Sequence, residues 1–126
     1  MDEGASGSGR RSASPAVLAA LRELQAEYGK VLPGLVEKLA GEVREARGAP
    51  ADPARLEGLR AQAHKLRGTA GSYGFHGVSQ AAARLEEAVQ RALAEPGEER
   101  WAPLEAAVAD MTAAAMETAE VLPFSG

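Results

Sequence analysis

The residues best suited to chemistry lie in the segment QAHKLRGTAGSYGF, residues 62–75, which contains one of the two histidines of the chain. His64 is followed closely by Lys65, Arg67 and Gly68. A neutral imidazole is a nucleophile near pH 7, because its ordinary pKa is about 6.5. Cations beside the ring favour a bound phosphoryl group and hold the imidazole in its neutral form. This grouping indicates nucleophilic chemistry directed at phosphate.

Helix phase predicts that His64 faces outward or lies at the edge of the groove. The core stripe of its helix passes through Ala63 and Leu66, and residue 64 lies about 100° around the helix from residue 63. Arg60 and Gly68 are its surface neighbours, one turn before and one turn after. Because Gly68 has no side chain, the backbone of another protein can come close to the ring.

The first helical segment is expected to begin near SASPAVL, where a serine can cap the helix and Pro15 suits its first position. An apolar stripe then follows at three- and four-residue steps: Leu18, Leu21, Leu24 or Gln25, Tyr28, Leu32, Leu35, Leu39 and Val43. Gly29 and Pro33 interrupt it. The segment is therefore either one long kinked helix or a short helix followed by a second.

Three further helices are predicted beyond the loop RGAPADPA at 47–54, in which Asp52 is placed to cap a helix that begins with Pro53. Glycines 71, 74 and 77 mark a turn, and EPGEER breaks the pattern again. The three apolar stripes are Leu56, Leu59, Ala63, Leu66 and Ala70; Val78, Ala82, Leu85, Val89 and Leu93; and Trp101, Leu104, Val108, Met111, Ala115 and Thr118.

Composition supports an all-α class. Only 4% of the residues are aromatic, and alanine and leucine dominate the apolar share, which favours helices over sheet. Short connections imply antiparallel neighbours around one core. The predicted fold is an antiparallel up-and-down four-helix bundle over residues 15–122, with an additional short N-terminal helix. A flexible Gly/Ser-rich tail at 1–14 and a C-terminal tail at 123–126 flank it.

Charge and residue usage argue against several classes of function. The net charge of -4 provides no general attraction for nucleic acid or anionic lipid. The absence of cysteine excludes disulfides, thiolate metal sites and thiol nucleophiles. Since no signal-peptide or membrane-spanning stretch is found, we expect a cytoplasmic protein. An acidic bundle whose core is satisfied internally is expected to be a monomer.

The segment from His64 onward resembles the signature helix of histidine-containing phosphotransfer domains of two-component phosphorelays. That signature has a histidine, an apolar residue two positions later, Lys or Arg three later and Gly four later, then small residues and another Gly. The matching residues here are His64, Leu66, Arg67, Gly68, Thr69, Ala70 and Gly71. LPGLVEKLAGEV and AAARLEEAVQRA also look like the preceding and following helices of the family, so the resemblance spans roughly residues 17–120.

The resemblance implies a four-helix bundle in which His64 is phosphorylated, usually on Nε2, by a histidine kinase or by the aspartyl phosphate of a receiver domain. The group then passes to the receiver domain of a response regulator. The partner would supply the aspartate and Mg²⁺, and this chain would supply no cofactor or metal of its own. Lys65 and Arg67 are the candidates for contacting phosphoryl oxygens. Arg60 is a weaker candidate, named from helix geometry.

Two residues of the following helix are further candidates. Glu86 occupies a position where some family members carry a Glu or Gln that bonds the other ring nitrogen, which would fix the tautomer. A solvated glutamate is the alternative. Gln80 is expected to line the docking surface. Many family members have lysine where this chain has Arg67, which keeps the charge but is bulkier and planar.

Other interpretations remain open at this stage. His76 lies across a glycine turn from His64, and without cysteine or a third histidine we expect a helix-entry or surface residue rather than a metal ligand. The chain could also be the phosphotransfer module of a larger histidine kinase. The alternative function is a non-phosphorylated helical-bundle adaptor that binds signalling proteins. It requires glycines that face the core, whereas Gly68 falls on the His64 face.

Overall fold

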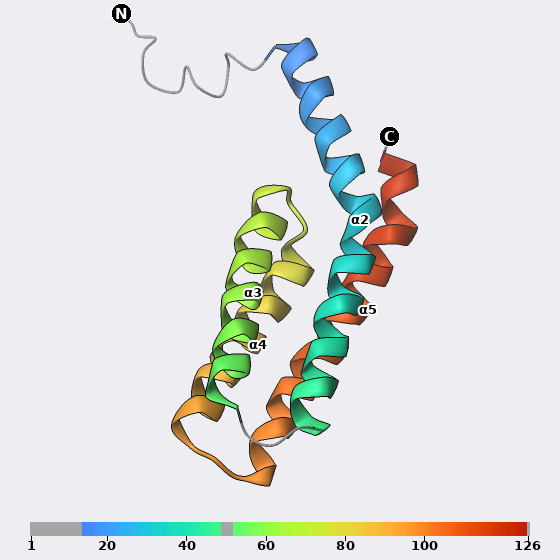
Figure 1. Ribbon diagram of the computed structural model, residues 1–126. Helices are drawn as coiled ribbons and strands as arrows, with labels where there is room; N and C mark the ends of the chain where they lie inside the picture. The colour runs from blue at the N-terminus through green and yellow to red at the C-terminus, as the bar shows by residue number, and fades with distance from the viewer. Residues whose placement is uncertain (1–13, 49–51, 126) are drawn as a thin grey trace, which may run out of the picture.

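The computed structural model describes residues 14–48 and 52–125 of the chain, with side chains as far as residue 117. It contains helices α2 (Pro15–Gly48), α3 (Pro53–Ser72), α4 (His76–Ala94) and α5 (Trp101–Ser125), with the 3-10 helix η1 (Glu98–Arg100) before α5. No strand occurs in these residues. Successive helices run in opposite directions (Figure 1). The predicted all-α helical bundle is confirmed.

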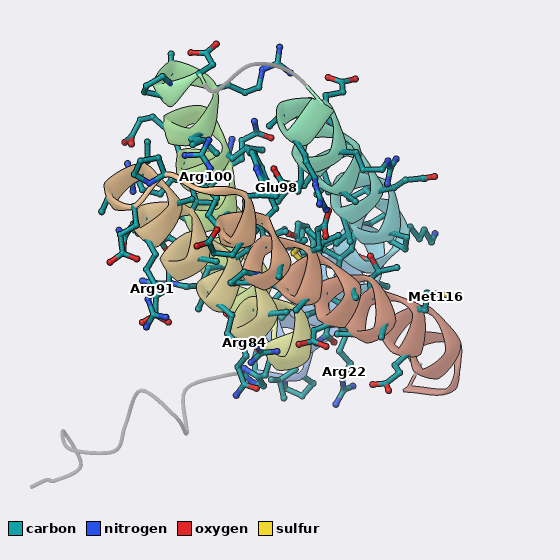
Figure 2. The ribbon with its side chains drawn as sticks, turned by 90° about the horizontal axis from the view of Figure 1, so that it is seen from below. Arg22, Arg84, Arg91, Glu98, Arg100 and Met116 are labelled. Atoms are coloured by element: carbon teal, nitrogen blue, oxygen red, sulfur yellow. The ribbon has the colours of Figure 1, made fainter. Side chains whose placement is uncertain are left out.

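The core lies where the predicted apolar stripes of the helices meet. The whole α3 stripe is buried, and so is nearly all of the α4 stripe, in which Leu93 is partly buried. In α5, Trp101, Leu104 and Met111 are buried. Seen from below (Figure 2), Arg84, Arg91 and Met116 lie on the outside of the bundle. Burial of these stripes is the main source of stability for such helices.

Helix α2 is one continuous helix of 34 residues with Pro33 inside it. A separate short N-terminal helix is not found in the described residues, so one of the two possibilities left open by the sequence is realised. Leu32 and Val36, on either side of the proline, are both buried. Their packing holds the helix together across a residue that lacks a donor. At its start, Ser14 caps the helix by accepting a hydrogen bond from Val17 N at 3.1 Å.

The predicted core stripe of α2 is wrong at Leu35, which is 43% exposed, and at the N-terminal end. Leu18, Leu21 and Leu24 are 42%, 53% and 50% exposed. At a rise of 1.5 Å per residue, α2 is about 20 Å longer than α3, and it continues beyond the end of α3 (Figure 1). These leucines therefore have no α3 opposite them. The expectation of a monomer was based on a core that is satisfied internally, and these exposed leucines lie outside that core.

The end of α3 that follows His64 is fixed by its backbone and by aromatic packing. Phe75 N donates to Ala70 O at 2.8 Å and Gly74 N donates to Gly71 O at 3.0 Å, which is the Schellman arrangement. Gly74 has a φ of 88°, a value that favours glycine. Tyr73 stacks on Tyr28 of α2, with ring centroids 4.8 Å apart. The carboxyl end of α3 is thereby attached to α2.

The predicted tails fall partly outside the described residues. The N-terminal tail over 1–14 lies outside them except for Ser14. Helix α5 is described as far as Ser125, so residues 123–125 of the expected C-terminal tail belong to this helix. At the start of α3, Asp52 Oδ1 accepts from Ala54 N at 3.1 Å, which confirms the predicted cap.

Candidate functional site

His64 lies on the outer face of α3. Its side chain is 59% exposed, whereas Ala63 and Leu66 beside it in sequence are buried in the core. The outward direction predicted from helix phase is therefore confirmed. The asymmetry arises because the apolar stripe of α3 is buried in the core, whereas His64, about 100° around the helix from Ala63, lies at the edge of the surface that faces solvent.

Gly68 leaves open space one turn along α3 from His64. A Cβ atom built at this position would meet no atom within 4 Å, and the residue is exposed. The open surface here is a shallow concavity of about 520 Å³, lined by His64, Lys65, Gly68, Thr69, Ser72 and Tyr73. Gly68 takes no part in a helix contact, which weighs against the adaptor alternative.

Close packing between α3 and α4 sets the relation of the two helices at the site. A Cβ atom at Gly71 would lie 3.1 Å from Ser79 Oγ. Ser79 Oγ donates a hydrogen bond to the carbonyl of Arg67 at 2.8 Å. The buried α4 residues 81, 82 and 88 are alanines, whose small side chains let the two helices approach closely. This close approach brings Glu86 of α4 to the imidazole of α3.

Glu86 is a buried carboxylate that contacts the imidazole. The residue is 8% exposed, and its Oε2 lies 3.0 Å from His64 Nδ1, so the alternative of a solvated glutamate is wrong. An ionised carboxylate only accepts hydrogen bonds, so this contact favours the neutral tautomer that carries its proton on Nδ1. Nε2 makes no hydrogen bond with the residues whose side chains are described. The lone pair of Nε2 is therefore available on the exposed side.

Arg60 and Arg67 both direct their cations at Glu86. Arg67 Nη1 lies 3.2 Å from Glu86 Oε1, and Arg60 Nη1 lies 3.8 Å from Oε2. Oε1 accepts no hydrogen bond from the described residues, so the Arg67 contact is an ion pair without hydrogen-bond alignment. A hydrogen bond to Glu57 and the charge of Glu57, followed by the charge of Glu86, raise the pKa of the Arg60 guanidinium.

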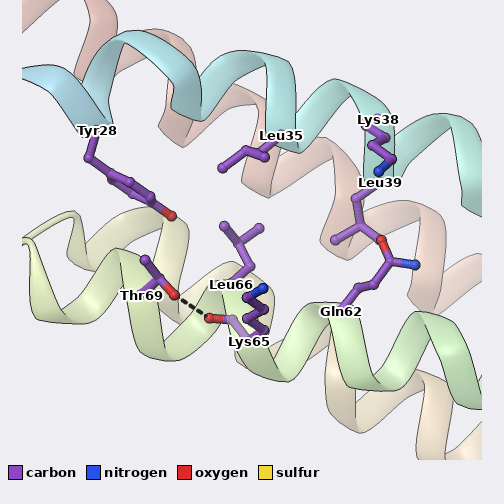
Figure 3. Close-up of a pocket in the computed structure, with 8 residues that line it drawn as sticks. All are labelled: Tyr28, Leu35, Lys38, Leu39, Gln62, Lys65, Leu66 and Thr69. Atoms are coloured by element: carbon purple, nitrogen blue, oxygen red, sulfur yellow. Dashed lines mark hydrogen bonds between the residues drawn. The ribbon is translucent and has the colours of Figure 1, made fainter.

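Lys65 lies at the border between the His64 concavity and a second one. This second concavity, of about 410 Å³, lies between α2 and α3 and is lined by Tyr28, Leu35, Lys38, Leu39, Gln62, Lys65, Leu66 and Thr69. Figure 3 shows its leucines and Tyr28 facing one another across the two helices, with Lys38 and Lys65 on opposite walls. An apolar groove with cations at its edge thus adjoins the open side of His64.

Gln80 and His76 lie apart from these contacts. Gln80 is exposed on α4, and no hydrogen bond joins it to the cluster around Glu86 within the described residues. Its expected part in docking stays a prediction. His76 is the first residue of α4 and is exposed, as expected for a helix-entry residue.

No role was predicted for Glu57, which the structure joins to the site. Glu57 Oε2 accepts from Arg60 Nε at 2.9 Å. The spacing of the two residues does predict this ion pair, because a glutamate three residues before an arginine on a helix is placed to pair with it. What the spacing could not show is that the pair lies beside Glu86 of another helix.

Two features of the described residues bear on other classes of function. In residues 14–48 and 52–117, no group of three or more His, Asp or Glu side chains is placed to hold a metal ion. Among the described helices, none has both the length and the apolar character needed to cross a membrane.

Comparison with known proteins identifies the family. The model of the Hpt domain family matches residues 19–118, most of the chain. Neither the curated proteins nor the solved structures contain a match. Hpt domains are phosphotransfer carriers of two-component signalling, and they interact with histidine kinases and with the receivers of response regulators. With its outward histidine on a four-helix bundle, the chain belongs to the Hpt domain family.

Proposed function

We propose that the chain is a phosphorelay intermediate that carries a phosphoryl group on Nε2 of His64. The group comes from a histidine kinase or from the aspartyl phosphate of a receiver domain and leaves to the receiver of a response regulator. In the step from a receiver, the Nε2 lone pair forms the N–P bond. The O–P bond breaks, its electron pair returns to the aspartate carboxylate, and Nδ1 keeps its proton.

The observation that carries this proposal is the unequal environment of the two ring nitrogens. Nδ1 lies 3.0 Å from the buried carboxylate of Glu86, which favours the tautomer with a free lone pair on Nε2. The side chain as a whole is 59% exposed, and Gly68 leaves open space one turn along the helix. A histidine that served only to stabilise the fold would not need an open side of this kind.

The partner supplies what the site lacks. Phosphoryl transfer passes through a loose, in-line transition state that needs positioning and charge neutralisation more than covalent assistance. The aspartate and Mg²⁺ belong to the partner receiver, and no cofactor of this chain takes part. Lys65, at the edge of the concavity beside His64, is the cation best placed to approach phosphoryl oxygens on the open side.

The surface around His64 suits the approach of another folded domain. Gly68 presents no side chain, so a partner backbone can come near the ring. The apolar groove between α2 and α3 adjoins this surface through Lys65 and Thr69. Gln80 extends the proposed docking surface onto α4. Burial of the groove together with open access to the ring would position the phosphorylated aspartate.

The test is transfer from a phosphorylated receiver, or from a kinase with ATP, to wild type, His64→Gln and His76→Gln. We expect acid-labile, alkali-stable phosphate on wild type and on His76→Gln, and none on His64→Gln. The His76 variant is the matched control, because it removes the other exposed histidine of the chain. Equal labelling of wild type and His64→Gln across several partners would show that the proposal is wrong.

A further inference from the structure

Glu86 requires more support than the hydrogen bond to His64 alone provides. Its side chain is 11% exposed, and removing a carboxylate from water is costly unless cations or donors replace the water. Arg67 approaches Oε1. The other oxygen, Oε2, is shared between His64 Nδ1 at 3.0 Å and Arg60 Nη1 at 3.8 Å. The oxygen that orients the imidazole is therefore itself backed by Arg60.

Arg60 is held on its other side by Glu57. Its Nε and Nη2 lie 2.9 and 2.7 Å from Glu57 Oε2, while Nη1 faces Glu86. All three guanidinium nitrogens are thus directed at carboxylates. The Arg60 side chain is 29% exposed, compared with 47% for Arg67. This arrangement leaves Arg60 poorly placed to bind a phosphoryl group on the open side of the ring.

We propose that Arg60 is a positioning residue, which holds the Glu86 carboxylate against His64 Nδ1, and that Glu57 anchors Arg60 in this place. The inference rests on the proposed function of His64. As Nε2 gives its lone pair to phosphorus, positive charge grows on the ring. The Nδ1–H···Oε2 hydrogen bond stabilises that charge only while the carboxylate stays ionised and in line.

Three variants of the full chain separate this role from others. Arg60→Gln removes the charge, whereas Arg60→Lys keeps it. Arg55→Gln is the matched control, because Arg55 lies on the same helix, is 44% exposed and pairs with Glu45 at 3.7 Å. The circular dichroism signal of all three should match that of wild type, since each position is at least partly exposed.

The first measurement is the ring tautomer of unphosphorylated His64, read from ¹⁵N–¹H spectra at about pH 8, where an ordinary imidazole is neutral. Wild type and Arg55→Gln should carry the proton on Nδ1. In Arg60→Gln the population should shift toward the Nε2–H form, and Arg60→Lys should stay close to wild type. This measurement needs no phosphorylated partner.

The second measurement is the rate of transfer from a phosphorylated receiver. We expect about a tenfold loss in Arg60→Gln, at the low end of the range of about 10- to 100-fold found for residues that orient metal-binding histidines, and recovery of most of it in Arg60→Lys. An Arg60→Gln spectrum identical to that of wild type would overturn the inference while leaving phosphorylation of His64 intact. A slower rate with an unchanged tautomer would also overturn it, because Arg60 would then act on the phosphoryl group or the partner.

The two proposals fail in different ways. If wild type takes no phosphate from any receiver or kinase, the proposed function is wrong. The tautomer spectra would still decide whether Arg60 positions Glu86. A shift in Arg60→Gln that Arg60→Lys reverses supports the inference, and the absence of a shift contradicts it.

Discussion

The two sides of the His64 imidazole are built in opposite ways. On the Nδ1 side, α4 contributes a buried carboxylate 3.0 Å from the ring, with the cations of Arg60 and Arg67 directed at it. On the other side, α3 presents Gly68 and a shallow concavity. The first, which we call the filled side, favours a proton on Nδ1. The second, the empty side, leaves the lone pair of Nε2 accessible. Substitutions on the first side should change the chemistry of transfer, whereas those on the second should change how the partner and its phosphoryl group approach the ring.

The largest effect is expected on the filled side, from Glu86→Ala. Without the carboxylate, the proton is no longer favoured on Nδ1, and no negative charge stabilises the positive charge that grows on the ring. Transfer should therefore slow by about 10- to 100-fold. Glu86→Gln should be milder, because its amide oxygen can still accept from Nδ1–H. Single-turnover transfer from a phosphorylated receiver measures both variants. A wild-type rate of transfer in Glu86→Ala would show that the Glu86 carboxylate takes no part in transfer.

A smaller effect, on binding, is expected on the empty side from Gly68→Gln. A side chain inserted into a packed contact that can relax costs about 1–2 kcal/mol, so receiver affinity should fall by roughly 5- to 30-fold. The stability of α3 should increase, because Gln is roughly 0.5–1 kcal/mol more favourable than Gly in a helix interior. Calorimetric titration and thermal unfolding would measure the two effects.

Gly58→Gln is the control for this prediction. Gly58 is also exposed on α3 with open space around it, and it lies about 15 Å from Gly68 along the helix. It should show the same gain in stability with unchanged receiver affinity. Equal affinity for the Gly68 and Gly58 variants would argue that the partner does not approach the ring over Gly68.

The smallest effect is expected from Lys65→Ala, at the edge of the empty side. An exposed cation contributes little, so transfer should slow by at most about fivefold, and the difference should shrink at high salt. Lys30→Ala, on α2, is the control, since Lys30 is 73% exposed and pairs with Glu27. A loss in Lys65→Ala that persists unchanged in high salt would indicate a role other than charge.

The sequence predicted the elements of the empty side well. Helix phase alone placed His64 outward and Gly68 beside it, because both properties depend only on the regular repeat of α3. The stripe from Leu56 to Ala70 was likewise buried in full. Local periodicity is sufficient to predict the buried residues of a helix that other helices cover along its whole length.

The filled side could be predicted only in part. A resemblance suggested Glu86, but its burial and the direction of Arg60 depend on how closely α4 packs on α3. The exposed Leu18, Leu21 and Leu24 show the same limit, since periodicity finds an apolar face without showing whether another helix covers it. The length of α2 relative to its neighbours decided that outcome, and it is a property of the assembled bundle.

The central claim is that His64 accepts the phosphoryl group on its exposed nitrogen. The most direct measurement is the ³¹P–¹⁵N correlation spectrum of the ¹⁵N-histidine-labelled chain after phosphorylation by a receiver or kinase. We expect phosphorus bonded to Nε2 of His64, with the proton of Nδ1 retained toward Glu86. Phosphorus on Nδ1 of His64 or on His76, or no phosphohistidine at all, would contradict it.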